Sequence, residues 1–205
     1  MDRHEELMRT TTTTALLEGL YDVQDGVVWQ VFDDRYRPVI IGVCRRLGLS
    51  DSEADDVAQE TLLQFLRDYR ADRYSRDRGR LRSWVVGIAR HRVIDYQRSR
   101  GRRKEKVGHS SATEVPDEGA LEEIWDQEQE RSILRMSIEE LRRTTRTTEK
   151  SIRAFEMVVF DRRPVEAVAE ALELKPHDVY VAKSRVTTKL REIVERLKNL
   201  YEVDS

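Results

Sequence analysis

Apolar residues recur every three or four positions along most of this chain, most clearly between Arg80 and Lys106. This is the period of an α-helix that buries one stripe of its surface. In that segment the stripe consists of Leu81, Val85, Ile88, Ala89, Val93 and Tyr96. No segment shows the two-residue alternation of a half-buried strand clearly enough to predict one. The sequence therefore predicts an all-α fold.

The same segment concentrates positive charge. It holds ten Lys and Arg residues against two acidic ones, a local balance of +8, in a 205-residue chain whose formal net charge is −2. A basic helix face suits a phosphate backbone, and Trp84 beside it suits stacking on an unpaired base. A solvated face next to a core tryptophan is the alternative interpretation.

We expect two small helical domains joined by a flexible linker, because 37% of the residues are charged and only 7% are aromatic. A disordered tail is predicted at residues 1–14, the first domain at 15–103, the linker at 104–119 and the second domain at 120–205. The linker carries basic residues only at its start. Eight acidic residues and no Lys or Arg follow between positions 107 and 130.

In the first domain the apolar period predicts helices at about 15–23 and 29–47. Pro38 is expected to bend or break the second of these, and Gly48 to end it. Ser50 and Glu53 form a capping box that opens the next helix, which ends near Tyr69. Residues 70–79 lack an apolar period and are predicted to be a polar loop.

In the second domain helices are expected at about 120–143, 147–161 and 164–172, and from Pro176 onward. The last two, joined by a short turn, have the form of a helix-turn-helix. The outer face of the final helix offers side chains that can reach base edges or phosphates: His177, Asp178, Tyr180, Val181, Lys183, Ser184 and Arg185. The turn has Glu173 where a glycine is common, so a plain helical hairpin remains an alternative.

The remaining composition excludes several classes of protein. The single cysteine, Cys44, allows no intramolecular disulfide and lies in an apolar helix, where a core role is expected. No cysteine-based zinc cluster is possible, and no cofactor or metal is predicted. No apolar run reaches the roughly 20 residues of a membrane span. The polar N-terminus does not resemble a signal peptide, so a cytoplasmic location is expected.

Three stretches together resemble the extracytoplasmic-function (ECF) sigma factors of bacterial RNA polymerase. They are DSEADDVAQETLLQFL, RGRLRSWVVGIARHRVIDYQRSRGRR and AVAEALELKPHDVYVAKSRVTTKLR, in the family's order. The resemblance covers about residues 15–200. It implies a non-enzymatic initiation factor that binds core RNA polymerase, reads the −35 promoter element as duplex and melts the −10 element.

The resemblance also implies roles for individual residues. Those that match the polymerase-binding segment are Asp56, Gln59, Glu60 and Leu63, and a helical projection places all four opposite the core stripe that runs from Ala54 to Phe65. The expected −10 contacts are Tyr74, Arg80, Arg82, Trp84, Arg90, Arg92 and Arg98, with residues 74–80 forming a pocket for a captured base. Four expected −35 contacts align with positions that contact DNA in relatives: Tyr180, Val181, Ser184 and Arg185. His177 and Lys183, on the outer face of the same helix, complete the set.

Two departures from the family concern the promoter sequence. Relatives often have an arginine where Tyr180 stands, and an LPxxxR-like opening of the second module is replaced by TTRTTEKSIRAF. Many relatives are held inactive by an anti-sigma factor, which makes such a protein a candidate partner; the sequence alone does not decide whether one exists. The acidic segment 114–130 is interpreted either as a mimic of nucleic acid inside the polymerase channel or as a solvated linker.

Two other functions compete with this interpretation. A metal-dependent nuclease could use His91 and Asp95, four residues apart on one helix, with carboxylates from Asp55, Asp56 and Glu60. A local ion pair or cap is the simpler role for the first two residues. A helix-turn-helix repressor acting without polymerase would explain residues 150–200. It would leave the basic helix and the exposed Leu63 without a purpose.

Overall fold

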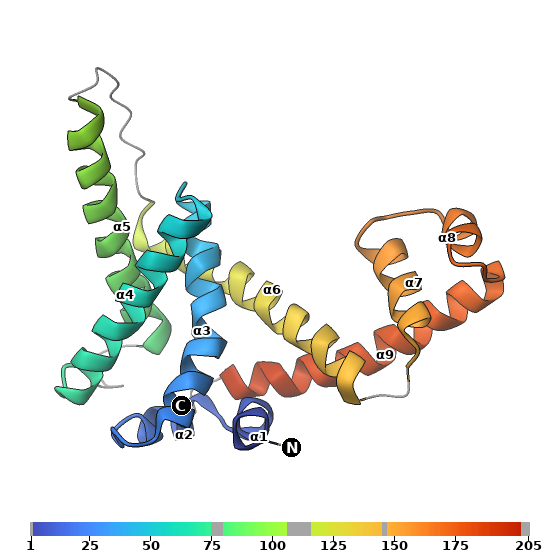
Figure 1. Ribbon diagram of the computed structural model, residues 1–205, viewed down its shortest axis with the longest axis horizontal. Coiled ribbons are helices and arrows are strands. Elements are labelled where there is room, and N and C mark those ends of the chain that lie inside the picture. The colour runs from blue at the N-terminus through green and yellow to red at the C-terminus, as the bar shows by residue number, and fades with distance from the viewer. Residues whose placement is uncertain (1, 75–79, 106–115, 145–146, 202–205) are drawn as a thin grey trace. The chain divides into compact units, whose positions relative to one another are not determined.

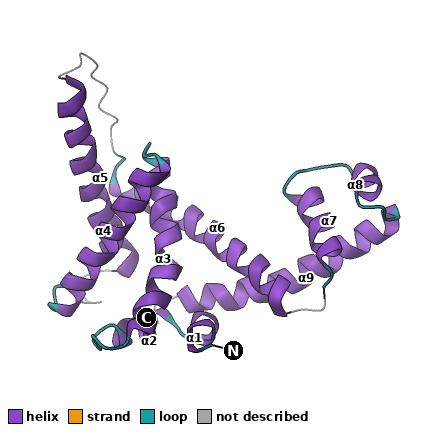
Figure 2. Ribbon diagram, in the orientation of Figure 1, coloured by secondary structure: helices purple, strands orange, loops and turns teal. Residues whose placement is uncertain are grey.

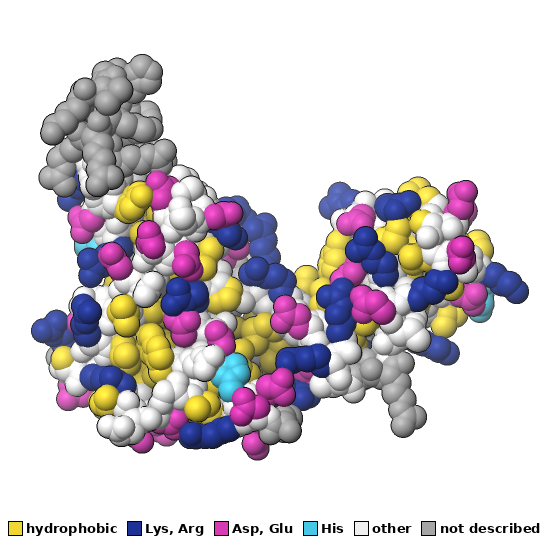
Figure 3. Space-filling model, in the orientation of Figure 1, with side chains coloured by type: hydrophobic (Ala, Val, Ile, Leu, Met, Phe, Trp, Pro, Cys, Tyr) yellow, Lys and Arg dark blue, Asp and Glu magenta, His cyan; other side chains and the backbone are white. Residues whose placement is uncertain are grey.

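The computed structural model describes residues 2–74, 80–105, 116–144 and 147–201, and within these ranges the chain forms nine α-helices and no strand (Figures 1 and 2). This confirms the predicted all-α fold. The chain divides into two compact units. Unit 1 is Met1–Ser132 together with Leu200–Ser205, and unit 2 is Ile133–Asn199. Figure 3 shows basic and acidic side chains interspersed over the visible face of each unit.

Unit 1 is built around α3 (Gly26–Arg46), which packs against α4 (Asp51–Arg70) and α5 (Leu81–Glu105). The contact between α3 and α4 is aromatic: the rings of Phe32 and Phe65 stack with centroids 5.2 Å apart. Along α5, Leu81, Val85, Ala89 and Val93 are buried, as the apolar period predicts. Val86, outside the predicted stripe, is buried as well.

The N-terminal residues differ from the predicted disordered tail. They form α1 (Arg3–Thr10) and α2 (Thr13–Gly19), the latter starting and ending before the predicted helix at 15–23. Arg3 donates two hydrogen bonds to the Asp25 carboxylate, and His4 lies 2.9 Å from Asp34. These partners lie more than twenty residues further along the chain, so the polar composition of the segment alone could not reveal the anchoring.

Pro38 neither breaks nor ends α3, which continues to Arg46. Its neighbours Val39 and Ile40 are fully buried, so tertiary packing holds the helix where one backbone N–H is missing. Gly48, with φ +83°, follows the helix end as predicted. The capping box of α4 is also confirmed, because the Ser50 N–H donates to Glu53 Oε2 at 2.7 Å.

The helix α6 (Glu118–Thr144) begins in unit 1 and ends in unit 2. Its first part, residues 118–132, buries Leu121 and Trp125, each 1% exposed, and the Trp125 ring lies 6.4 Å from that of Tyr36. The predicted domain boundary, by contrast, lies before residue 120. The assignment of residues 15–103 and 120–205 to two sigma domains remains a prediction.

The last residues of α9 (Pro176–Tyr201) also belong to unit 1. The buried guanidinium of Arg35 donates to the Leu200 carbonyl at 3.2 Å, and the Tyr201 hydroxyl donates to the Arg35 carbonyl at 3.1 Å. Burial lowers the pKa of the Arg35 side chain. Carbonyl groups at a helix C-terminus carry partial negative charge, which suits this cation.

Unit 2 consists of the second part of α6, α7 (Glu149–Val159), α8 (Val165–Ala171) and most of α9. Its core comprises two apolar clusters. One contains Ile138, Leu141, Ile152, Phe155, Val186 and Leu190. The other contains Ala154, Met157, Val168, Ala169, Val179 and Ala182.

The turn between α8 and α9 has the short length that the sequence predicts. Glu173 takes the left-handed conformation with φ 52°, and the Leu174 N–H donates to the Ala169 carbonyl at 2.8 Å. A non-glycine residue accepts this conformation at some energetic cost. The two helices and their turn are therefore present, whereas their use as a DNA-reading helix-turn-helix remains a prediction.

Candidate functional site

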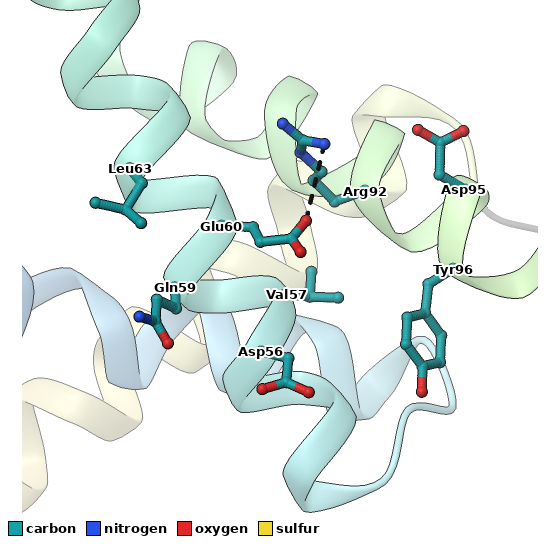
Figure 4. Close-up of a pocket in the computed structure, with 8 residues that line it drawn as sticks. All are labelled: Asp56, Val57, Gln59, Glu60, Leu63, Arg92, Asp95 and Tyr96. Carbon is teal, nitrogen blue, oxygen red and sulfur yellow. Dashed lines mark ion pairs between the residues drawn. The ribbon is translucent and has the colours of Figure 1, made fainter. Parts of the chain in front are cut away.

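One exposed surface of α4 carries four side chains that the sequence singled out: Asp56, Gln59, Glu60 and Leu63. They line an open pocket of about 410 Å³ (Figure 4). Leu63 is 37% exposed, which is high for a leucine on a helix that also contributes to the core. We call these four residues the α4 face.

The α4 face is exposed because of the helical period. Buried residues of α4 recur three and four positions apart and pack inward, namely Ala54, Val57, Ala58, Thr61, Leu62 and Phe65. The intervening positions 56, 59, 60 and 63 point outward, which confirms the predicted projection. The Thr61 hydroxyl is satisfied locally, since it donates to the Val57 carbonyl at 2.7 Å.

The helix α5 supplies the other side of this pocket through Arg92, Asp95 and Tyr96 (Figure 4). Arg92 lies 3.8 Å from Glu60 and donates to the Gln64 amide oxygen at 3.3 Å. Tyr96 donates to Glu53 at 3.0 Å. Arg92, which the sequence grouped with the −10 contacts, therefore lies with the α4 face.

Tyr74 and Trp84 meet at the start of α5. Tyr74 is only 5% exposed, and its ring contacts that of Trp84 edge-on, with centroids 5.8 Å apart. Its ring also lies 6.1 Å from those of Phe65 and Tyr69. Tyr74 is thus a core residue here rather than an open wall of a base pocket. Residues 75–79, the rest of that predicted pocket apart from Arg80, lie outside the described residues.

Trp84 is half-buried, and its indole N–H is buried without a hydrogen-bond partner among the described residues. Both interpretations from the sequence retain support. The ring packs against Tyr74 as a core tryptophan would, yet an unpaired buried donor is unusual and suits a site that a ligand completes.

Arg82 is held by carboxylates of α6. It donates to Asp126 at 2.5 Å and to Glu122 at 3.1 Å, and Ser83 donates to Glu122 at 2.5 Å. The sequence feature that could have indicated this contact is the four-residue spacing of Glu122 and Asp126, which places both carboxylates on one side of a helix.

The remaining predicted −10 residues do not lie on the same side of α5 as Arg82, so together they form no single basic stripe. Arg80 and Arg98 are exposed, and Arg98 lies 4.0 Å from Asp95. Arg90 and Arg92, two positions apart, point about 200° apart around the helix. The seven predicted −10 residues therefore occupy several surfaces of α5 and the segment before it.

The first turns of α9 present the predicted −35 contacts on one side. His177, Lys183, Ser184 and Arg185 are exposed, Val181 is half-buried, and Tyr180 is 56% exposed. The inward positions Val179, Ala182 and Val186 are buried. Among the described residues, no hydrogen bond or ion pair within the chain holds the side chains of His177, Tyr180, Lys183 or Arg185.

The candidate nuclease residues do not gather into a metal site. His91 Nδ1 lies 2.7 Å from the Gly87 carbonyl oxygen, and Asp95 faces Arg98. Within the described residues no three His, Cys, Asp or Glu side chains could hold a metal ion together.

Cys44 is fully buried as expected, and burial raises the pKa of its thiol to about 12. Across the same residues, no helix has the length and apolar character needed to span a membrane.

Residues 32–103 match the sequence model of the family described as Sigma-70 region 2. No curated protein matches the chain. The matched segment contains the α4 face and every predicted −10 residue, whereas the predicted −35 residues lie outside it. In sigma-70 family sigma factors, which are transcription factors rather than enzymes, the domain of that name binds RNA polymerase and the −10 promoter element.

Proposed function

We propose, on the premise that residues 32–103 are a sigma-70 region 2 domain, that this protein is a bacterial initiation factor of the extracytoplasmic-function type. Its first domain binds core RNA polymerase and melts the −10 element. Its second domain reads the −35 element as duplex. The proposal places the protein in the cytoplasm, with core polymerase and promoter DNA as its partners.

The α4 face carries the polymerase contact. It combines an exposed apolar side chain, Leu63, with the acidic and amide groups of Asp56, Gln59 and Glu60 along the same helix, and such a mixture of apolar and polar groups is typical of protein interfaces. Core packing fixes the opposite side of the same helix, so the face is presented rigidly. A rigid surface loses little conformational entropy on binding.

The helix α5 and the residues before it carry the −10 contact. Arginines along α5 can bind phosphates of the single strand, while Trp84 offers a ring face and an unpaired N–H to a base. Tyr74 is buried and packs edge-on against Trp84, so capturing a base at this point requires the two rings to separate locally. This agrees with an element that acts on DNA only when the duplex is opened.

The first turns of α9 carry the −35 contact. Tyr180, Lys183, Ser184 and Arg185 are exposed on one helix whose other side is anchored in the core of unit 2. A helix presented in this way fits the major groove. Joining two modest DNA contacts in one chain raises the affinity for a promoter that carries both elements.

The exposed Leu63, at the C-terminal end of the α4 face, is the observation that carries this proposal, and a pull-down tests it. Core RNA polymerase should be retained by the wild-type protein, and Leu63→Arg should weaken retention by about tenfold or more, since changing an interface residue that contributes strongly to binding costs roughly 2 kcal/mol or more. Val23→Arg is the matched control: Val23 is 68% exposed in the same unit and lies outside the α4 face.

Run-off transcription on fragmented genomic DNA completes the test. Promoter-dependent transcripts with wild type and Val23→Arg, and not with Leu63→Arg, would establish an initiation factor and reveal its promoter. If no variant bound core polymerase while the chain alone bound duplex tightly, the protein would instead be a helix-turn-helix repressor.

A further inference from the structure

The first part of α6, residues 118–132, lies on unit 1 although it follows the matched region 2 segment in the chain. Its apolar side chains Leu121 and Trp125 are buried there. Its polar side chains contact α3 and α5: Glu128 meets Arg46, and Glu122 with Asp126 meets Arg82. We call residues 118–132 the docked segment.

The docked segment occupies one of the predicted −10 residues of α5, Arg82, together with its neighbour Ser83. Both terminal nitrogens of the Arg82 guanidinium donate to carboxylates of this segment, and the Ser83 hydroxyl donates to one of them. A carboxylate and a phosphate oxygen accept the same hydrogen bonds from arginine. A phosphate can therefore bind the terminal nitrogens of Arg82 only after Glu122 and Asp126 have moved away.

The fit of the docked segment depends on a close approach to α3. The Glu128 side chain is 8% exposed and bonds Arg46 at 3.2 Å and Arg131 at 2.6 Å. It passes directly over Gly42, where a Cβ atom would lie 2.8 Å from Glu128 Cγ. Any larger residue at position 42 would collide with the docked segment.

Docking leaves the polymerase contact accessible. Asp56, Gln59, Glu60 and Leu63 remain exposed while the segment is in place. The segment therefore covers one of the two activities assigned to region 2 and spares the other.

We propose that residues 118–132 form an autoinhibitory segment, which mimics the DNA backbone through Glu122 and Asp126 and closes region 2 to −10 DNA until it is displaced. The inference rests on the proposed function. It predicts that the protein binds core polymerase in the closed state and acquires −10 binding only when the segment leaves. The apparent affinity for DNA is then reduced by the fraction of molecules that remain closed.

A disulfide that locks the segment tests the inference. In Gly42→Cys/Glu128→Cys, the two new side chains start within bonding reach of one another, and native Cys44 stays inert because burial raises the pKa of its thiol to about 12. Holoenzyme containing the oxidised variant should bind a forked −10 DNA about tenfold or more weakly than the same sample after reduction. Its affinity for core polymerase should be the same in both states. Glu128→Cys alone should not respond to oxidation.

Equal DNA binding by the oxidised and reduced forms, with core binding intact, would overturn the inference and leave the proposed function standing. Failure of wild type to bind core polymerase would overturn the proposed function itself. The two failures are therefore distinguishable.

A second variant keeps the test decisive if the double cysteine does not fold. Glu122→Gln/Asp126→Asn removes both charges that hold Arg82, and holoenzyme should then bind forked −10 DNA roughly threefold to tenfold more tightly. Glu123→Gln/Glu130→Gln makes the same change in net charge at two exposed positions of the same helix. An equal gain with both pairs would indicate a general charge effect, and no gain with either would also contradict the inference.

Discussion

The two helices that we propose bind DNA, α5 and α9, differ in how many of their polar side chains are already bound within the chain. On α5, Arg82 is bound by α6 and Arg92 lies against α4. On α9, the side chains of His177, Tyr180, Lys183 and Arg185 are exposed, and among the described residues none has an ion pair or hydrogen bond within the chain.

In the proposed function, this difference corresponds to the two kinds of DNA to be bound, an unpaired strand at the −10 element and duplex at the −35 element. Duplex is always available, so a rigid exposed helix can read it without rearrangement. An unpaired strand exists only after melting, and a site for it can remain closed until then. We infer that the contacts of α5 within the chain delay −10 binding, whereas α9 can bind duplex without rearrangement.

Reversing the charge of Arg185 should produce the largest effect on the α9 side of this comparison. Arg185→Glu replaces a phosphate or base contact with repulsion, and promoter-dependent transcription should fall by about a hundredfold, since one such contact accounts for roughly 1–3 kcal/mol. Binding to core polymerase should be unchanged. Run-off transcription with a pull-down measures both.

Arg191→Glu is the control for this change. Arg191 is exposed on the same helix beyond the predicted contacts, so the same charge reversal there should reduce transcription by less than about threefold. Equal losses from the two variants would mean that α9 attracts DNA only through its overall charge.

Substitutions of Trp84 should have the next largest effect. They distinguish a packing role of this side chain from a role in base capture on α5. Trp84→Ala should cost about 2 kcal/mol of unfolding free energy, less than a fully buried tryptophan, because the side chain is half-buried. Trp84→Phe keeps the ring contact with Tyr74 and should cost less than about 1.5 kcal/mol. Denaturant unfolding measures both losses.

The same two variants then address function. If Trp84 binds a base, Trp84→Phe should lower open-complex formation by more than its small loss of stability explains, because it removes the indole N–H. Normal open-complex formation by a stable Trp84→Phe protein would assign Trp84 to the core alone.

Local sequence patterns were enough to predict much of the fold and the exposure of the α4 face. The apolar period placed the buried sides of α4 and α5, and the exposure of Leu63 followed from the same projection. The capping box at Ser50 and the helix end at Gly48 depend only on neighbouring residues, so they could be predicted from the sequence.

What the sequence could not provide were contacts between distant segments. The anchoring of α1 depends on Arg3 and Asp25, and the closed state of α5 depends on Arg82 and residues about forty positions away. Charged residues of this kind look solvated in sequence, because nothing local distinguishes a free side chain from one with a distant partner. For the same reason, nothing in the sequence around Arg92 indicates its ion pair with Glu60, and its predicted −10 contact stays a prediction.

Gly42→Ala should have a smaller effect on stability than the Trp84 variants. It should weaken the packing of the docked segment, residues 118–132, against unit 1. Alanine favours the helix by about 1 kcal/mol over glycine, but its Cβ collides with Glu128, so the net change in unfolding free energy should be below about 1 kcal/mol. Trp125 should become more exposed and its fluorescence should shift to the red, measured with Trp29 and Trp84 replaced by phenylalanine.

Gly87→Ala is the matched control, because a Cβ at Gly87 in α5 meets nothing within 4 Å. That variant should gain about 0.5–1 kcal/mol without a spectral shift. A shift in Gly87→Ala, or none in Gly42→Ala, would contradict the role of Gly42 in docking.

The smallest expected effect is a loss of stability at low pH, which should be confined to unit 1. Hydrogen bonds from the Arg3 guanidinium hold the pKa of Asp25 below its ordinary value of 3.8. A carboxyl whose pKa is lower in the folded state stabilises the fold above its unfolded pKa and loses that contribution as the pH falls through the folded pKa. The attachment of α1 to unit 1 should therefore weaken below about pH 4, and Arg3→Ala should move the Asp25 titration upward, as followed by NMR of the carboxyl carbon. Because the pair lies entirely within unit 1, this contribution should affect the unfolding of unit 1 alone, and an equal effect of Arg3→Ala on unit 2 would show that the two units do not unfold independently.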